Sequence, residues 1–129
     1  MLNSLIISLV LASHADSLTC TRGVIRQTTG GAVIAEAADY CFNEEKNRLI
    51  SKNCKNRDCP AFDRLKIVNF SEIYGQHSNP GFNLCRKLEG HPQIIEFKVG
   101  KEWYALDRCV FKDGTFADVG QLLGFYTRK

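Results

Sequence analysis

After residue 15, the sequence has no apolar run that could cross a bilayer, for which about 20 apolar residues are needed. The 129-residue chain also has few prolines, three in all, and 44% of its residues are hydrophobic. This composition excludes a disordered or fibrous chain. We therefore predict one globular domain with no transmembrane segment in its mature form.

Motifs of common catalytic centres are missing as well. There is no G-x-S-x-G elbow, phosphate-binding loop or H-E-x-x-H helix. The C-x-x-C redox motif is absent, and the one close cysteine pair, Cys54 and Cys59, lacks the second close pair of a zinc site. The two histidines after residue 15, His77 and His91, lie in turn-like sequences. We therefore predict no catalytic residue, metal or cofactor, and we favour a binding role over catalysis.

Residues 1–15 have the features of an export signal. They contain no Lys, Arg, Asp or Glu, and Leu5 to Ala12 is an apolar run of signal-peptide length. Ser13-His14-Ala15 supplies the small residues that a signal peptidase reads. We predict cleavage before Asp16 and a secreted or periplasmic domain formed by residues 16–129. The alternative is a buried hydrophobic N-terminal strand or helix.

All six cysteines follow the predicted cleavage site. They are Cys20, Cys41, Cys54, Cys59, Cys85 and Cys109. An even number of cysteines in an exported chain indicates a disulfide framework, although the sequence alone leaves the pairing open.

A short internal sequence similarity suggests how the cysteines pair. The segment from Ala37 to Cys41 resembles the segment from Ala105 to Cys109. On this interpretation the domain has two similar halves, 16–70 and 71–129, although chance similarity is an alternative. The halves would then contain the pairs Cys20–Cys41 and Cys85–Cys109, which leaves Cys54 to pair with Cys59.

The second half has the clearest local structure. Asn79 can cap a helix that starts at Pro80 and runs to Glu89, where Gly90 would end it in the left-handed conformation. Turn signals at Gly100-Lys101 and Asp113-Gly114 then predict a three-stranded antiparallel meander over residues 93–119.

The first of these turns sets the register of its hairpin. If Val99 pairs with Glu102, Phe97 faces Tyr104 and Ile95 faces Leu106. A helix over 80–89 that covers the meander would bring Cys85 within bridging distance of Cys109. The predicted fold class is therefore α+β, a small disulfide-stapled domain with this meander and this helix.

Strands are harder to locate in the first half. Short runs at Ala32–Ala35, Arg48–Ser51 and Leu65–Phe70 are the strand candidates there.

Residues 79–125 resemble a short bacterial domain family of unknown function that is labelled putative haemolysin. The resemblance rests on Asn79-Pro80, Cys85, Gly90, Cys109 and Asp113-Gly114-Thr115. Members occur in exported proteins and lipoproteins, so the resemblance implies export and a Cys85–Cys109 disulfide. It assigns no mechanism to particular residues.

Positive charge is concentrated in one segment, residues 46–57, which contains no acidic residue. Its basic residues are Lys46, Arg48, Lys52, Lys55 and Arg57. The segment is either a solvated loop or a contact for an anionic envelope surface or an acidic protein. Because no aromatic residues are interleaved with the basic ones, nucleic acid is not expected as a partner.

A second binding candidate is Phe62, in the loop Lys55 to Arg64, with a core position for Phe62 as the alternative. The sequence thus predicts an exported small binding or inhibitory protein that acts through a rigid disulfide scaffold. A secreted hydrolase-type enzyme and a membrane-active, haemolysin-like protein are the alternatives.

Overall fold

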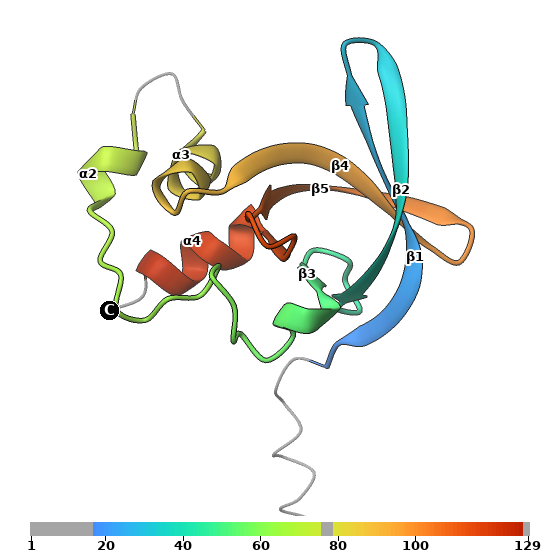
Figure 1. Cartoon of the computed structure of the whole chain (residues 1–129), viewed down its shortest axis with the longest axis horizontal. Helices are drawn as coiled ribbons and strands as arrows, with labels where there is room; N and C mark the ends of the chain where they lie inside the picture. The colour runs from blue at the N-terminus through green and yellow to red at the C-terminus, as the bar shows by residue number, and fades with distance from the viewer. Residues whose placement is uncertain (1–16, 76–78, 128–129) are drawn as a thin grey trace, which may run out of the picture.

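The computed structural model describes residues 17–75 and 79–127. The predicted signal peptide, its cleavage site and His77 lie outside these residues. The described part forms a closed barrel of six antiparallel strands in the order β1-β2-β3-β6-β5-β4, with β4 paired to β1 (Figure 1). The strands are β1 (Thr19–Thr29), β2 (Ala32–Phe42), β3 (Leu49–Ser51), β4 (His91–Val99), β5 (Glu102–Val110) and β6 (Phe116–Asp118).

Short helices lie beside the barrel. They are the 3-10 helix η2 (Lys52–Cys54), α2 (Phe70–Ile73), α3 (Pro80–Lys87) and α4 (Val119–Thr127). Within the described residues, no helix has the length and apolar character needed to cross a membrane.

The predicted fold class, an α+β domain with a three-stranded meander and one helix, is wrong. The register predicted for its first hairpin is confirmed, because Val99 pairs with Glu102 and Ile95 with Leu106. The sheet continues past the hairpin, however, since β4 also pairs with β1 along Ile25–Gln27. The sequence of β1, TCTRGVIRQTT, is mostly polar and has no clear alternation, so it was not recognised as a strand.

The candidate strand at Leu65–Phe70 is also wrong. This segment has no regular structure before α2 begins at Phe70. Its alternation does not reflect an apolar face, because Leu65 and Ile67 are exposed while Val68 packs against the core.

Element order repeats along the chain. Two long strands and one three-residue strand occur first as β1-β2-β3 and again as β4-β5-β6. Cys41 pairs with Ile50, Ile50 with Ala117, and Ala117 with Cys109, so the two cysteines flank the junction between the short strands. The relationship between the halves 16–70 and 71–129 stays a prediction.

The cysteines pair as Cys20–Cys41, Cys54–Cys59 and Cys85–Cys109. These are the pairs that the two-halves interpretation predicted. The first bridge joins β1 to β2 and the third joins α3 to β5, so each ties together elements of the same half.

The end of α3 corrects one local expectation. The predicted cap is confirmed at its start, where the Asn79 side chain accepts a hydrogen bond from the Phe82 N–H (3.0 Å). At the other end, the left-handed residue is Glu89, with a φ of 69°, and not Gly90. Gly90 is needed for a different reason, because a Cβ there would lie 2.3 Å from the Cys109 sulfur.

Candidate functional site

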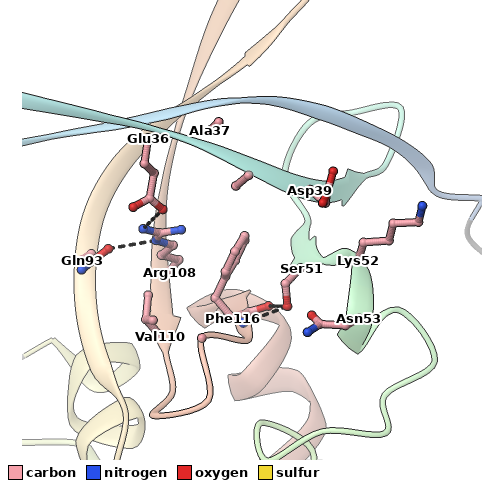
Figure 2. A pocket seen from close by; sticks show the side chains of 12 residues that line it. Glu36, Ala37, Asp39, Ser51, Lys52, Asn53, Gln93, Arg108, Val110 and Phe116 are labelled. Atoms are coloured by element: carbon pink, nitrogen blue, oxygen red, sulfur yellow. Dashed lines mark hydrogen bonds and ion pairs between the residues drawn. The ribbon is translucent and has the colours of Figure 1, made fainter.

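A groove of about 760 Å³ opens between β2, the end of β3 and β5 (Figure 2). Strand β2 forms one wall, and Gln93 of β4 and Arg108 of β5 form another. The lining residues are Glu36, Ala37, Ala38, Asp39, Ser51, Lys52, Asn53, Gln93, Arg108, Val110, Gly114 and Phe116. Residues from both halves of the chain therefore build this groove.

Arg108 is the buried cation of the groove, with 3% of its side chain exposed. Its Nε donates to the Gln93 side-chain oxygen (2.9 Å), and its Nη2 donates to Glu36 (3.2 Å). The guanidinium also lies over the Phe116 ring, 4.6 Å from its centroid. These contacts fix the plane of the guanidinium against the wall of the groove.

Burial lowers the pKa of Arg108, and the nearby Glu36 carboxylate offsets part of this change. An arginine keeps its charge in proteins because its usual pKa is so high. The groove therefore contains a permanent positive charge. Glu36, which is about half exposed at 49%, neutralises it from the β2 side.

The Nη1 nitrogen of Arg108 takes part in neither of its two side-chain hydrogen bonds. Among the residues drawn in Figure 2, Arg108 donates hydrogen bonds to Gln93 and Glu36. Arg108 lines the groove, and its side chain is 3% exposed there. A guanidinium with one free edge can bind a carboxylate through two parallel hydrogen bonds.

Strand β2 presents an open backbone edge to the groove. It pairs with β1 along its whole length but with β3 only at Tyr40–Phe42. Along Ala32–Asp39, the side away from β1 has no strand partner among residues 17–75 and 79–127.

The first disulfide shows which backbone groups point outward from β2. Cys20 lies directly opposite Cys41, with their Cα atoms 3.9 Å apart. Such a short distance identifies a non-hydrogen-bonded pair, for which about 4.5 Å is typical. The N–H and C=O of Cys41 therefore point away from β1. Because this pattern alternates and the register has no bulge, the same holds for Ala35, Ala37 and Asp39.

Side chains at this edge favour close approach by another backbone. Ala35, Ala37 and Ala38 are small, and β2 has no lysine or proline at Ala32–Asp39 to block pairing. Proteins usually protect open strand edges with such residues. This edge is therefore suited to pairing with an additional strand.

The groove lacks an evident nucleophile. The Ser51 hydroxyl donates to the Phe116 carbonyl oxygen (3.3 Å) and accepts from the Phe116 N–H (2.9 Å), so it joins β3 to β6. Asp39 forms an exposed ion pair with Arg22 (3.0 Å). The described lining thus combines charged side chains with the outward backbone groups of β2.

The basic segment 46–57 does not form one surface. Lys52 lines the groove, whereas Arg48, Lys55 and Arg57 line a separate hollow of about 270 Å³ beside Gln121. Lys46 lies near the Tyr104 ring, 5.5 Å from its centroid, and donates to the Glu44 carbonyl oxygen. Of the predicted binding residues, only Lys52 therefore belongs to the groove.

Phe62 belongs to the core. It is 6% exposed and packs edge-on against Phe125, with their ring centroids 5.1 Å apart. Arg57 covers the Phe62 ring at 4.8 Å. The structure thus shows for Phe62 the core position that the sequence left open as the alternative to a binding role.

Sequence reasoning missed Arg108, Gln93 and Glu36. A signal for the first two was present, because the predicted pairing of Val99 with Glu102 also places Gln93 opposite Arg108. Glu36 could not be found in this way, since its approach to Arg108 depends on barrel closure between the two halves.

Comparisons with known proteins add no relative. No protein family matches this sequence, and neither a curated protein nor a solved structure matches the chain. The resemblance to the family labelled putative haemolysin stays a prediction.

Proposed function

We propose that this protein is an exported binding protein that holds an extended segment of a partner protein along the open edge of β2. The observation that carries the proposal is the open edge at Ala32–Asp39, beside a groove with a buried arginine. Adding a strand to an exposed sheet edge is a common mode of peptide recognition. Main-chain hydrogen bonds supply affinity in this mode, and neighbouring pockets supply specificity.

The groove favours a segment that carries a carboxylate, either an acidic side chain or a C-terminus. Arg108 would bind it through Nη1, and Lys52, which also lines the groove, would add a second positive charge. Glu36 and Asp39 already have cationic partners, so they repel such a carboxylate less than free carboxylates would.

A rigid scaffold and an export route support this role. The bridge Cys20–Cys41 ties β1 to β2 and the bridge Cys85–Cys109 ties α3 to β5, which lowers the ordering cost when a partner binds. Disulfides persist in oxidising compartments, which agrees with a secreted or periplasmic location.

The test is selection from a displayed library of short linear peptides on the oxidised protein. We expect enriched peptides that contain a carboxylate. Ala37→Pro should abolish their binding, because it removes an N–H that points to the groove and not to β1. Lys52→Glu should weaken binding by up to about fivefold, since exposed ion pairs contribute up to about 1 kcal/mol.

Lys101→Glu is the matched control, because Lys101 lies in the exposed β4–β5 turn, away from the groove. It makes the same change in charge and should leave peptide binding unchanged. The proposal fails if no peptide is enriched, or if enriched peptides bind the Ala37→Pro variant as well as the natural protein. A dimer that Ala37→Pro converts to a monomer would assign the edge to self-association instead.

A further inference from the structure

Leu65 and Ile67 are the most exposed large apolar side chains of the described residues, at 90% and 91%. They lie in the segment between η2 and α2, which runs along the side of the molecule opposite the β1–β2 hairpin (Figure 1). Two aromatic side chains follow closely, Phe70 at 44% and Tyr74 at 53% exposure, and their rings contact each other. Exposed apolar side chains gathered in this way usually mark a contact surface.

Both ends of this segment are fixed to the core. On one side, the Tyr126 hydroxyl accepts from the Asp63 N–H (2.9 Å) and donates to the Ala61 carbonyl oxygen (2.7 Å). On the other side, Ile73 of α2 is fully buried. Leu65 and Ile67 are therefore held outward by a supported loop.

Positive charge is interleaved with these apolar residues. Arg64 and Lys66 are exposed, and no described acidic residue forms an ion pair with either. The nearby acids have other partners, since Asp63 accepts from the Leu65 N–H (3.0 Å) and Glu72 pairs with Lys87 (2.7 Å). The exposed tip of the loop thus combines two cations with two large apolar side chains.

A hollow of about 460 Å³ adjoins the loop on the side of α4. Its lining residues are Arg57, Asp63, Arg64, Lys66, Ile67, Val68, Phe125 and Tyr126. Three cations and one acid beside apolar side chains match a phospholipid, whose phosphate is anionic and whose chains are apolar.

We infer that the surface formed by Arg64, Leu65, Lys66, Ile67 and Phe70 docks the protein onto an anionic phospholipid bilayer. Leu65 and Ile67 enter the boundary between headgroups and acyl chains, while Arg64 and Lys66 contact lipid phosphates. Interfacial binding of this kind combines buried apolar area with attraction to anionic lipids. The surface is separate from the groove beside β2, so this inference does not depend on the proposed function.

The first experiment is co-sedimentation of the oxidised protein with vesicles of phosphatidylglycerol and phosphatidylcholine in equal parts. We expect binding to these vesicles and much weaker binding to phosphatidylcholine alone. The double variant Leu65→Asn/Ile67→Asn should lower the partition constant at least about tenfold, because two buried apolar side chains are lost. Its matched control is Val33→Asn/Ile94→Asn, which replaces apolar residues that are 63% and 67% exposed elsewhere.

The contribution of charge is tested separately. Arg64→Gln/Lys66→Gln should lower the partition constant about fivefold for each charge removed. Lys101→Gln/Lys112→Gln removes the same charge from other exposed positions and should have a smaller effect. Equal losses in the two double variants would mean that only net charge attracts the protein, which contradicts a specific docking surface.

Insertion is measured directly with Leu65→Trp. Its fluorescence should shift to shorter wavelength with anionic vesicles, whereas the emission of Ile94→Trp should not. The inference is overturned if natural protein does not sediment with anionic vesicles, or if the Leu65→Asn/Ile67→Asn variant binds them as well as its control.

Discussion

Arg108 and Asp118 are the two buried charged side chains of the described residues. They lie opposite each other on β5 and β6, yet none of the ion pairs among the described residues joins them. Arg108 turns to Glu36 and Gln93, whereas Asp118 accepts from the Leu49 N–H (2.8 Å) and from Gln121. Asp118 therefore lacks a cationic partner, and burial raises its pKa despite these hydrogen bonds.

The raised pKa of Asp118 predicts a particular pH dependence of stability. The Asp118 carboxyl binds its proton more tightly in the folded chain than in the unfolded chain. Protonated Asp118 therefore adds to the free energy of unfolding in full below the usual pKa of 3.8, and this stabilisation is lost as the pH rises through the raised pKa of the folded chain. The difference in free energy of unfolding between the natural protein and Asp118→Asn should therefore shrink with rising pH. Urea unfolding at a series of pH values measures it.

Asp113 supplies the control for that experiment. Hydrogen bonds from Thr115 lower the pKa of Asp113. Ionised Asp113 therefore stabilises the folded chain, and this stabilisation is lost as the pH falls, the opposite of the dependence on Asp118. The difference between natural protein and Asp113→Asn should grow with rising pH, although exposure of this side chain keeps the effect small. A constant difference for Asp118→Asn across the pH range would contradict the account of Asp118.

At the scale of elements, local signals were sufficient for one hairpin and for the start of one helix. The β4–β5 register followed from one turn, and α3 began where Asn79 and Pro80 predicted. The candidate strand Arg48–Ser51 overlaps β3, and Ala32–Ala35 covers only the start of β2. Strand β1 was missed because its sequence is mostly polar and has no clear apolar alternation.

Packing of β1 on β2 depends on one glycine. A Cβ at Gly23 would lie 2.1 Å from the Tyr40 hydroxyl oxygen, which donates to the Lys98 carbonyl oxygen (2.6 Å). Gly23→Ala should therefore lower the free energy of unfolding by about 1–3 kcal/mol, the usual cost of overpacking. Gly124→Ala is the control, since nothing lies within 4 Å of a Cβ in α4. It should raise stability by about 0.5–1 kcal/mol through helix propensity. Thermal or urea unfolding of both variants measures these changes, and a neutral Gly23→Ala would contradict this packing.

At the scale of the whole molecule, barrel closure sets both the fold and the groove. Pairing of β1 with β4 and of β3 with β6 joins the two halves and brings Glu36 to Arg108. Neither pairing has a local sequence signal, so closure of the sheet into a barrel could not be predicted from the sequence. Because the groove forms only when the barrel closes, Lys52 is the one groove residue that the sequence analysis predicted as a binding residue. The cysteine pairing, in contrast, followed from the internal sequence similarity.

Amide hydrogen exchange along β2, with and without a selected peptide, tests the open-edge account most directly. In the free protein, the outward amides of Ala35, Ala37 and Asp39 should exchange fast, and those of Glu36 and Ala38, bonded to β1, should exchange slowly. Bound peptide should protect the outward set and leave the other set unchanged. Slow exchange of the outward amides in the free protein, or no new protection when the peptide binds, would contradict the account of β2 as an open edge.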